Sequence, residues 1–344
     1  MPLKRVAGTG TVIRSVPPRA EVLFGQVQPG RLPLVLTKPR EDMGVCDLQA
    51  AAYSKAVFGA DRGGGMMRLR GVRRSRNVED RRRMSGRSGA GIGGVGLLVV
   101  LAIGYFAGVD VTPLLQGAGQ PQGGEMRQLS AEEERAAEFT SRVLATTEEV
   151  WGRVFPAQVG QAYRPPVLVL FSARTSSPCG GASGATGPFY CPADRKAYLD
   201  TQFFATLSQR LGARGDFAAA YVIAHEVAHH VQNELGILPQ VNEARQNSSQ
   251  TRANALTVRL ELQADCLSGV WARNVQGLLE PGDVEEALNA ARMIGDDRLQ
   301  RNAGQVPQPH TFTHGTSEQR AGWFARGYQS GDIGTCDTFS AQRI

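Results

Sequence analysis

The chain contains the run His225-Glu226-Val227-Ala228-His229, which lies within an apolar stretch from Phe217 to Val231. The stretch predicts a helix packed inside a domain. Histidines four residues apart on a helix project from one face, about one turn apart. Two imidazole nitrogens at this spacing suit one Zn²⁺ ion at roughly 2.0–2.1 Å. Glu226 is placed to act as a base toward a water on that metal. His230 points elsewhere on the helix, and we expect it to be structural.

A catalytic zinc site needs a third protein ligand and an open fourth position. The extended histidine pattern is absent, because Gln232 and Leu235 occupy the positions where it needs glycine and histidine. A second helix, predicted over 254–274, carries carboxylates four residues apart at Glu261 and Asp265. We expect Glu261 to be the third metal ligand. Asp265 is then placed to accept the free N–H of a ligating histidine and to fix its tautomer.

Amide hydrolysis builds negative charge on the carbonyl oxygen, and this charge needs a hydrogen-bond donor besides the metal. We expect His314, in a loop before a predicted helix at 316–328, to be that donor. Tyr190, Tyr198 and His310 are alternatives. His314 has a competing interpretation as a loop residue that caps the following helix.

Five runs of the chain together carry a family resemblance. They are residues 67–82, 187–194, 225–232, 261–266 and 312–320. The chain resembles the bacterial "putative neutral zinc metallopeptidase" family, whose members are membrane-anchored and similar to gluzincins. The resemblance covers about residues 67–340. It implies zinc at His225, His229 and Glu261, with Glu226 as the base.

The remaining pattern predicts an α+β, zincin-like metallopeptidase domain over 129–344, mostly helical with a small sheet. Predicted helices cover 130–154, 216–235, 254–275, 281–294 and 316–328, and predicted strands cover 167–171 and 196–200. In zincins an edge strand near the metal helix pairs with the substrate backbone, which is a form of strand addition. We expect Tyr198 to Asp200 to form that strand.

An uncharged apolar run at 89–109 follows the arginine-rich segment 67–88. About 20 apolar residues span a bilayer as a helix, and arginines on the N-terminal side predict a cytoplasmic N-terminus. We therefore expect a basic cytoplasmic segment at 67–88, one transmembrane helix at 89–109, a linker at 110–128, and a domain on the periplasmic or extracellular side of the bacterial inner membrane. A buried soluble helix and a cleaved signal peptide are the alternatives. The glycines and the length of the run disfavour them.

Residues 1–66 hold scattered Pro and Gly without an amphipathic period, and Met66 and Met67 follow directly. A start at Met67 gives a short basic segment and then the apolar run, which is a normal layout for a single-span protein. We expect residues 1–66 to be a mis-called start or a disordered extension.

The cysteines fit an oxidising compartment, since a bacterial periplasm permits disulfides. We predict the pairs Cys179–Cys191 and Cys266–Cys336, although four cysteines allow three pairings and free buried thiols are an alternative. Cys46 is left over.

These patterns predict a membrane-anchored zinc peptidase that acts on peptides or proteins. The alternative is a membrane-tethered binding or scaffold protein in which zinc is structural; such a zinc is closed by four ligands, and only three are found. The net charge of +6 and the arginines between Arg68 and Arg87 make nucleic-acid binding a third option. The adjacent apolar run and the lack of interleaved aromatic residues argue against it, so we expect no nucleic-acid partner.

Overall fold

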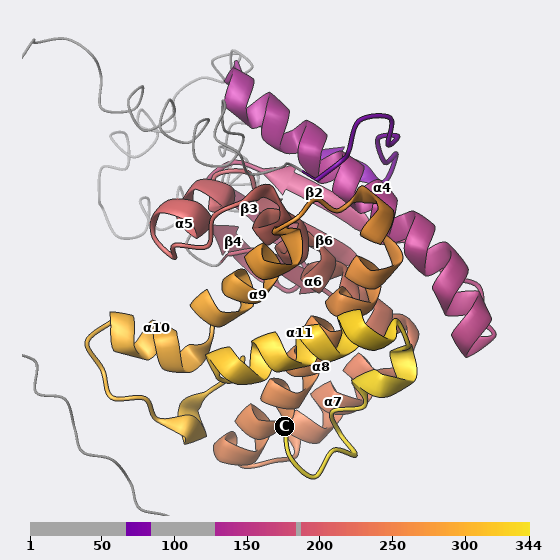
Figure 1. The fold of residues 1–344 in the computed structure, drawn as a ribbon. Coiled ribbons are helices and arrows are strands. Elements are labelled where there is room, and N and C mark those ends of the chain that lie inside the picture. The colour runs from indigo at the N-terminus through magenta and orange to yellow at the C-terminus, as the bar shows by residue number, and fades with distance from the viewer. Residues whose placement is uncertain (1–66, 84–127, 184–186) are drawn as a thin grey trace, which may run out of the picture. The chain divides into compact units, whose positions relative to one another are not determined.

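The computed structural model describes residues 67–83, 128–183 and 187–344. Most of this part is helical, with a small sheet, so it has the predicted α+β class (Figure 1). The α-helices are α4 (Ala131–Val159), α5 (Phe203–Gln209), α6 (Asp216–Glu234), α7 (Ile237–Gln246), α8 (Gln250–Asn274), α9 (Asp283–Met293), α10 (Asp296–Asn302) and α11 (Ser317–Ser330). The 3-10 turns are η1 (Gln276–Leu278), η2 (Pro309–Thr311) and η3 (Ile333–Cys336). The strands are β1 (Val78–Asp80), β2 (Val167–Phe171), β3 (Arg174–Ser177), β4 (Gly180–Ser183), β5 (Phe189–Cys191) and β6 (Lys196–Asp200).

The main sheet has the order β1-β2-β6-β5, and β3 and β4 form a separate hairpin. β1, β2 and β6 run parallel, while β5 pairs antiparallel with β6. This order differs from the expected substrate strand. Tyr198 and Asp200 lie on β6, which is paired on both sides, and both residues are buried. The edge beside α6 belongs to β5, whose three residues are too few to show a periodic pattern.

The apolar helix α6 forms the centre of the domain, and α4, α8 and α9 pack around it. Its first turn is fixed by the stacking of Phe217 on Trp271 of α8, with ring centroids 5.6 Å apart. Helix α4 begins after the N-cap Ser130, whose side chain accepts from the Glu133 amide in a capping box. Figure 1 shows α4 running along one side of the domain, while α11 crosses in front of α8.

Helices α8 and α11 cross at two glycines. A Cβ atom at Gly327 would lie 1.8 Å from the Cys266 carbonyl oxygen, and one at Gly269 would lie 2.1 Å from the Phe324 carbonyl oxygen. Only glycine fits at so close an approach of two backbones. The crossing brings the N-terminal turns of α11, and with them Arg320, against the middle of α8.

Residues 67–83 are part of this domain, which differs from the expected boundary at 129. Met67 is buried in the core, β1 hydrogen-bonds in register with β2, and Arg82 donates to the Glu133 carbonyl oxygen. Several arginines pair with acids of the domain: Arg68 with Glu280, Arg73 with Glu148, Arg74 with Glu138, and Arg82 with Glu134. Composition alone indicated a free basic segment because its acidic partners lie far away in the sequence.

Both predicted disulfides are confirmed, with Cα atoms 5.8 Å apart for Cys179–Cys191 and 5.5 Å apart for Cys266–Cys336. The first joins the β3–β4 hairpin to β5, and the second ties η3 to α8. Within the described ranges, no helix has the length and apolar character needed to cross a bilayer. The predictions for residues 1–66, for the run at 89–109, for most of the linker and for Cys46 fall outside the described residues.

Candidate metal centre and its cleft

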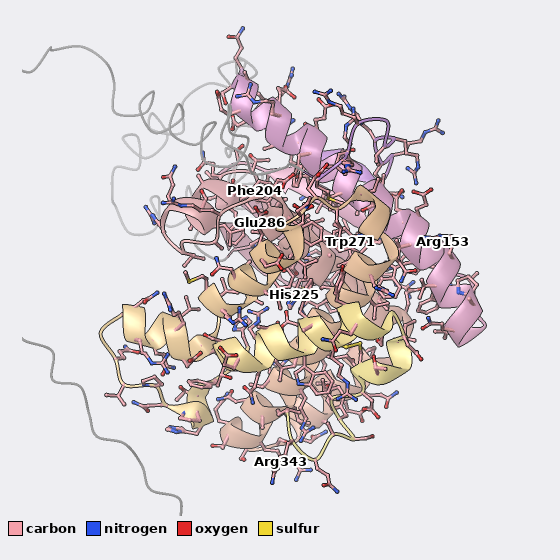
Figure 2. All side chains as sticks on the ribbon, viewed as in Figure 1. Arg153, Phe204, His225, Trp271, Glu286 and Arg343 are labelled. Atoms are coloured by element: carbon pink, nitrogen blue, oxygen red, sulfur yellow. A yellow bond between two sulfur atoms is a disulfide. The ribbon has the colours of Figure 1, made fainter. Side chains whose placement is uncertain are left out.

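The predicted ligands come together where α6 crosses α8. The Nε2 atom of His225 lies 3.1 Å from Oε2 of Glu261, and the Nε2 atom of His229 lies 3.5 Å from Oε1 of the same carboxylate. One nitrogen or oxygen atom from each of the three residues lies within 4.8 Å of the others. The two imidazoles therefore face one carboxylate with the same type of nitrogen atom. Figure 2 shows His225 in the interior of the domain, far from the peripheral Arg153 and Arg343.

His225 is held from behind by Asp265, one turn after Glu261 on α8. The Nδ1 atom of His225 lies 2.9 Å from Oδ1 of Asp265. The carboxylate also accepts hydrogen bonds from Tyr221 Oη at 2.5 Å and from Arg320 at 2.9 Å through both Nε and Nη2. Because a carboxylate with these donors only accepts, Nδ1 of His225 carries a proton and Nε2 presents its lone pair when the ring is neutral. Asp265 thus lies where it was predicted.

His229 is held by a neutral group instead. Its Nδ1 atom lies 2.8 Å from Oε1 of Gln232, which is buried. The amide nitrogen of Gln232 donates to the Leu260 carbonyl oxygen at 2.7 Å and to Oε1 of Gln263 at 3.1 Å. These bonds fix which way the Gln232 amide faces, so Nε2 of His229 is also left with a free lone pair.

The centre attracts positive charge. Burial lowers the pKa of His225, but the hydrogen bonds and charges of Asp265 and Glu261 outweigh it and raise that pKa to about 10. Burial raises the pKa of Glu261, and the charges and hydrogen bonds of the two histidines bring it well below its usual range. Two imidazole nitrogens, each oriented by a second residue, and a carboxylate oxygen form a donor set that suits zinc.

The three ligands line a cleft of about 680 Å³. Glu226, from the same face of α6, lies in its wall, and burial raises the pKa of its carboxyl group. The other side of the cleft includes β5, through Phe189 and Tyr190, and the loop that carries His314. A carboxyl group with a raised pKa beside a metal centre is suited to taking up and releasing a proton.

His314 reaches the cleft from the loop before α11, with its side chain half exposed. Asp296 holds the loop by accepting backbone N–H bonds from Thr313, His314 and Gly315, and its Oδ1 atom lies 3.3 Å from Nδ1 of His314. Thr316 is the N-cap of α11, so the histidine does not cap that helix.

The alternative donors are engaged elsewhere. The Tyr190 hydroxyl lies 3.0 Å from Nδ1 of His230, whose Nε2 donates to the Arg164 carbonyl oxygen at 2.6 Å. His230 thus has the structural position that was expected. Tyr198 donates to Asp194 at 2.6 Å and does not line the cleft, and His310 is exposed outside it.

The sequence did not predict Arg320, which pairs with Asp265, or Gln232, which orients His229. Arg320 lies 55 residues beyond Asp265, so only the fold could pair them. Gln232 follows His229 by three residues, a spacing at which helix side chains meet. That spacing was the available signal.

The fold and the site thus place three residues that could bind a metal ion on two crossing helices, in the wall of a cleft. The sequence model of the family described as "Putative neutral zinc metallopeptidase" matches residues 67–339, and the chain belongs to that family. The chain is 49% identical over 284 residues to "Uncharacterized protein YpfJ" of Escherichia coli K12, covering 79% of this chain and 99% of that protein. It is 43% identical over 216 residues to "Uncharacterized protein Rv2575" of Mycobacterium tuberculosis H37Rv, covering 58% and 70% respectively. No solved structure matches the chain.

Proposed function

We propose that this protein is a zinc-dependent peptidase with His225, His229 and Glu261 as metal ligands. The observation that carries the proposal is the convergence of both Nε2 atoms on the Glu261 carboxylate in the wall of a cleft that also contains Glu226. The family supports zinc and peptide-bond hydrolysis as the reaction class. The donor set holds three protein ligands, which is the number in catalytic sites, whereas structural sites have four.

Bound zinc would supply Lewis-acid chemistry, by polarising a carbonyl group and activating a water molecule. Glu226 accepts a proton from the attacking water and later delivers it to the leaving amine. Asp265 and Gln232 keep the two imidazole rings in place during both steps.

His314 is the proposed donor to the carbonyl oxygen as that oxygen gains charge. His314 lines the cleft, and its Nδ1 atom lies 3.3 Å from Oδ1 of Asp296. Its Nε2 atom can donate to the carbonyl oxygen when the ring is an imidazolium, in which both nitrogens carry protons. An extended substrate would pair with the edge of β5, through the strand-addition geometry first expected of β6. Peptides or unfolded protein segments are the substrate class that fits such an edge.

We further propose that the run at 89–109 attaches the protein to a membrane, with residues 67–83 and 128–344 in one compartment. The pairing of β1 with β2 supports the second part, because paired strands cannot be separated by a bilayer. A membrane-impermeant thiol reagent applied to intact cells should label Arg70→Cys and Arg343→Cys alike. Labelling of only one of them would reject the shared compartment.

The decisive test of function is Glu226→Gln in the purified full chain. We expect the variant to retain one zinc per chain and to lose cleavage of casein by about 10²–10⁴-fold, the usual contribution of a general acid–base group. Glu149→Gln, at an exposed position on α4, is the matched control and should be fully active. A wild-type protein that holds zinc without cleaving any peptide would support the scaffold alternative. Loss of zinc in Glu226→Gln would make that residue structural.

His314→Leu tests the oxyanion role separately. We expect kcat to fall by about 10²–10³-fold with zinc content unchanged, which is the effect of removing one such donor. His310→Leu changes an exposed histidine four residues earlier and should leave kcat unaltered. An unchanged kcat in His314→Leu would remove His314 from the mechanism.

A further inference from the structure

A second cluster of carboxylates lies at the N-terminal end of α6, formed by Asp216, Asp283 and Glu286. One oxygen atom from each lies within 4.8 Å of the others. Asp216 is 3% exposed and Asp283 is 1% exposed. Across the described ranges, no lysine, arginine or histidine forms an ion pair or side-chain hydrogen bond with these three residues. Glu280 and Glu285, which also face Asp283, add negative charge.

The cluster receives only backbone donors. Oε2 of Glu286 accepts from the Phe217 amide at 3.1 Å, and Oδ2 of Asp283 accepts from the Glu280 amide at 2.8 Å. Oδ1 of Asp283 is buried and has no partner. The α6 N-terminus contributes about half a unit of positive charge, which is too little for three carboxylates. A buried, unpartnered oxygen in such a cluster indicates that a cation belongs there.

The remaining donor is the backbone nitrogen of Met67, which lies 2.8 Å from Oδ2 of Asp216. Met67 is 3% exposed, so this nitrogen meets the cluster inside the protein. The Arg68 side chain turns away, to Glu280. When Met67 is joined to a preceding residue, its nitrogen is a neutral amide with one N–H. At the start of a chain it is an ammonium with three N–H groups and a full charge.

We propose that Met67 is the first residue of the functional protein and that its α-ammonium group is the cation of the Asp216–Asp283–Glu286 cluster. The comparisons agree with this start. The family match begins at residue 67, and the E. coli relative aligns over 99% of its own length with 79% of this chain. The cluster is then a binding site for an amine, and its ligand is the chain's own terminus.

Electrostatics of the uninterrupted chain fit the missing charge. Burial, followed by the charge of Asp283, raises the pKa of Asp216 to about 6, and burial, followed by the charge of Asp216, raises that of Glu286 to about 7. Groups with raised pKa values stabilise the fold at low pH and lose that contribution as pH rises through those values. A chain with residues 1–66 attached should therefore lose stability between about pH 4 and 7.

An ammonium at Met67 moves the loss of stability to higher pH. It keeps the carboxylates ionised, and they in turn raise its own pKa above the usual 7.7–8.0 of an α-amine. Its contribution is complete below about pH 8 and is lost as pH rises through the folded-state pKa. The two chains thus differ in the pH range over which stability declines.

The first experiment is intact-mass and N-terminal peptide analysis of the protein isolated from its native source. We expect an N-terminal peptide that begins at Met67 with an unmodified α-amine. A terminus at residue 1 or at Met66, or a blocked amine, would overturn the proposal.

The second experiment compares thermal unfolding of chains 1–344 and 67–344. At pH 7 we expect the shorter chain to have a Tm higher by on the order of 10 °C, the scale of restoring a partner to a buried charge. Asp216→Asn should lower the Tm of chain 67–344 and should not lower that of chain 1–344. Glu285→Gln, which removes a nearby exposed carboxylate, is the control and should leave the difference in place.

Equal Tm values for the two chains, or the same loss from Asp216→Asn in both, would reject the ammonium. A second metal ion per chain that Asp283→Asn removes would also overturn the proposal, because the cluster would then hold a divalent cation.

Discussion

The two halves of helix α6 both lie among buried carboxylates, and they differ in what balances the negative charge. Near its C-terminal end, Glu261 and Asp265 face two imidazoles and the Arg320 guanidinium. Around its first turn, Asp216, Asp283 and Glu286 receive only backbone N–H donors from the residues that the structure describes. The pKa values respond in opposite directions: those of Glu261 and Asp265 are depressed, while those of Asp216 and Glu286 are raised.

Burial alone does not give a carboxylate its role. Burial raises the pKa in every one of these residues, and the neighbouring cations decide the outcome. Asp265 is fully paired inside the protein and can act only as a support. The Asp216–Asp283–Glu286 cluster needs a positive charge from another group. Substitutions at the metal centre and at this cluster test the difference.

The largest effect is expected from Glu261→Ala, which removes a negative charge and a proposed ligand from the metal centre. Zinc affinity should fall by roughly 10³-fold, because a small set of ligands shares a binding free energy on the order of 10 kcal/mol. Competition with a zinc-sensitive dye measures it. The first-turn cluster lies outside this set, so Glu286→Gln should leave zinc affinity unchanged. Equal losses in both variants would mean that the two ends are not independent.

The next effect is expected from Arg320→Leu, which leaves Asp265 without its cationic partner, as Asp216 is. Asp265 would keep its buried charge without its bidentate partner, a change that typically costs about 3–5 kcal/mol. The Tm should fall by about 10 °C. Arg343→Leu, an exposed arginine at the periphery (Figure 2), should change the Tm very little. A small shift for Arg320→Leu would mean that Asp265 is stabilised mainly by Tyr221 and His225.

The smallest effects are expected at the two residues that orient the imidazoles, the charged Asp265 and the neutral Gln232. Asp265→Asn should weaken zinc binding by about 10–100-fold, the range for residues that orient a ligating histidine. Gln232→Leu should weaken it by about 10-fold, since Gln232 gives His229 a hydrogen bond without a charge. Titration of the apo-protein with zinc measures both. The reverse order would show that His229 depends more on its support than His225 does.

The sequence was informative wherever the chemistry depends on local spacing. The pairs His225/His229 and Glu261/Asp265 sit four residues apart on long helices, so their shared faces follow from helix geometry. Both disulfides were also predicted, as one of the three pairings that four cysteines allow. These features involve one helix or a small set of cysteines.

The features that could not be predicted depend on order in space. Three-residue strands such as β1 and β5 have no measurable period, so the edge position fell on the wrong strand, β6. The pairing of Asp265 with Arg320 requires the close crossing of α8 and α11 at Gly269 and Gly327. A local pattern does not contain that contact.

Strand β1 is hydrogen-bonded to β2 in one sheet, so the residues on either side of the undescribed segment, Arg83 and Gln128, lie on the same side of any membrane. The arginines of residues 67–83 therefore share the environment of the two disulfides.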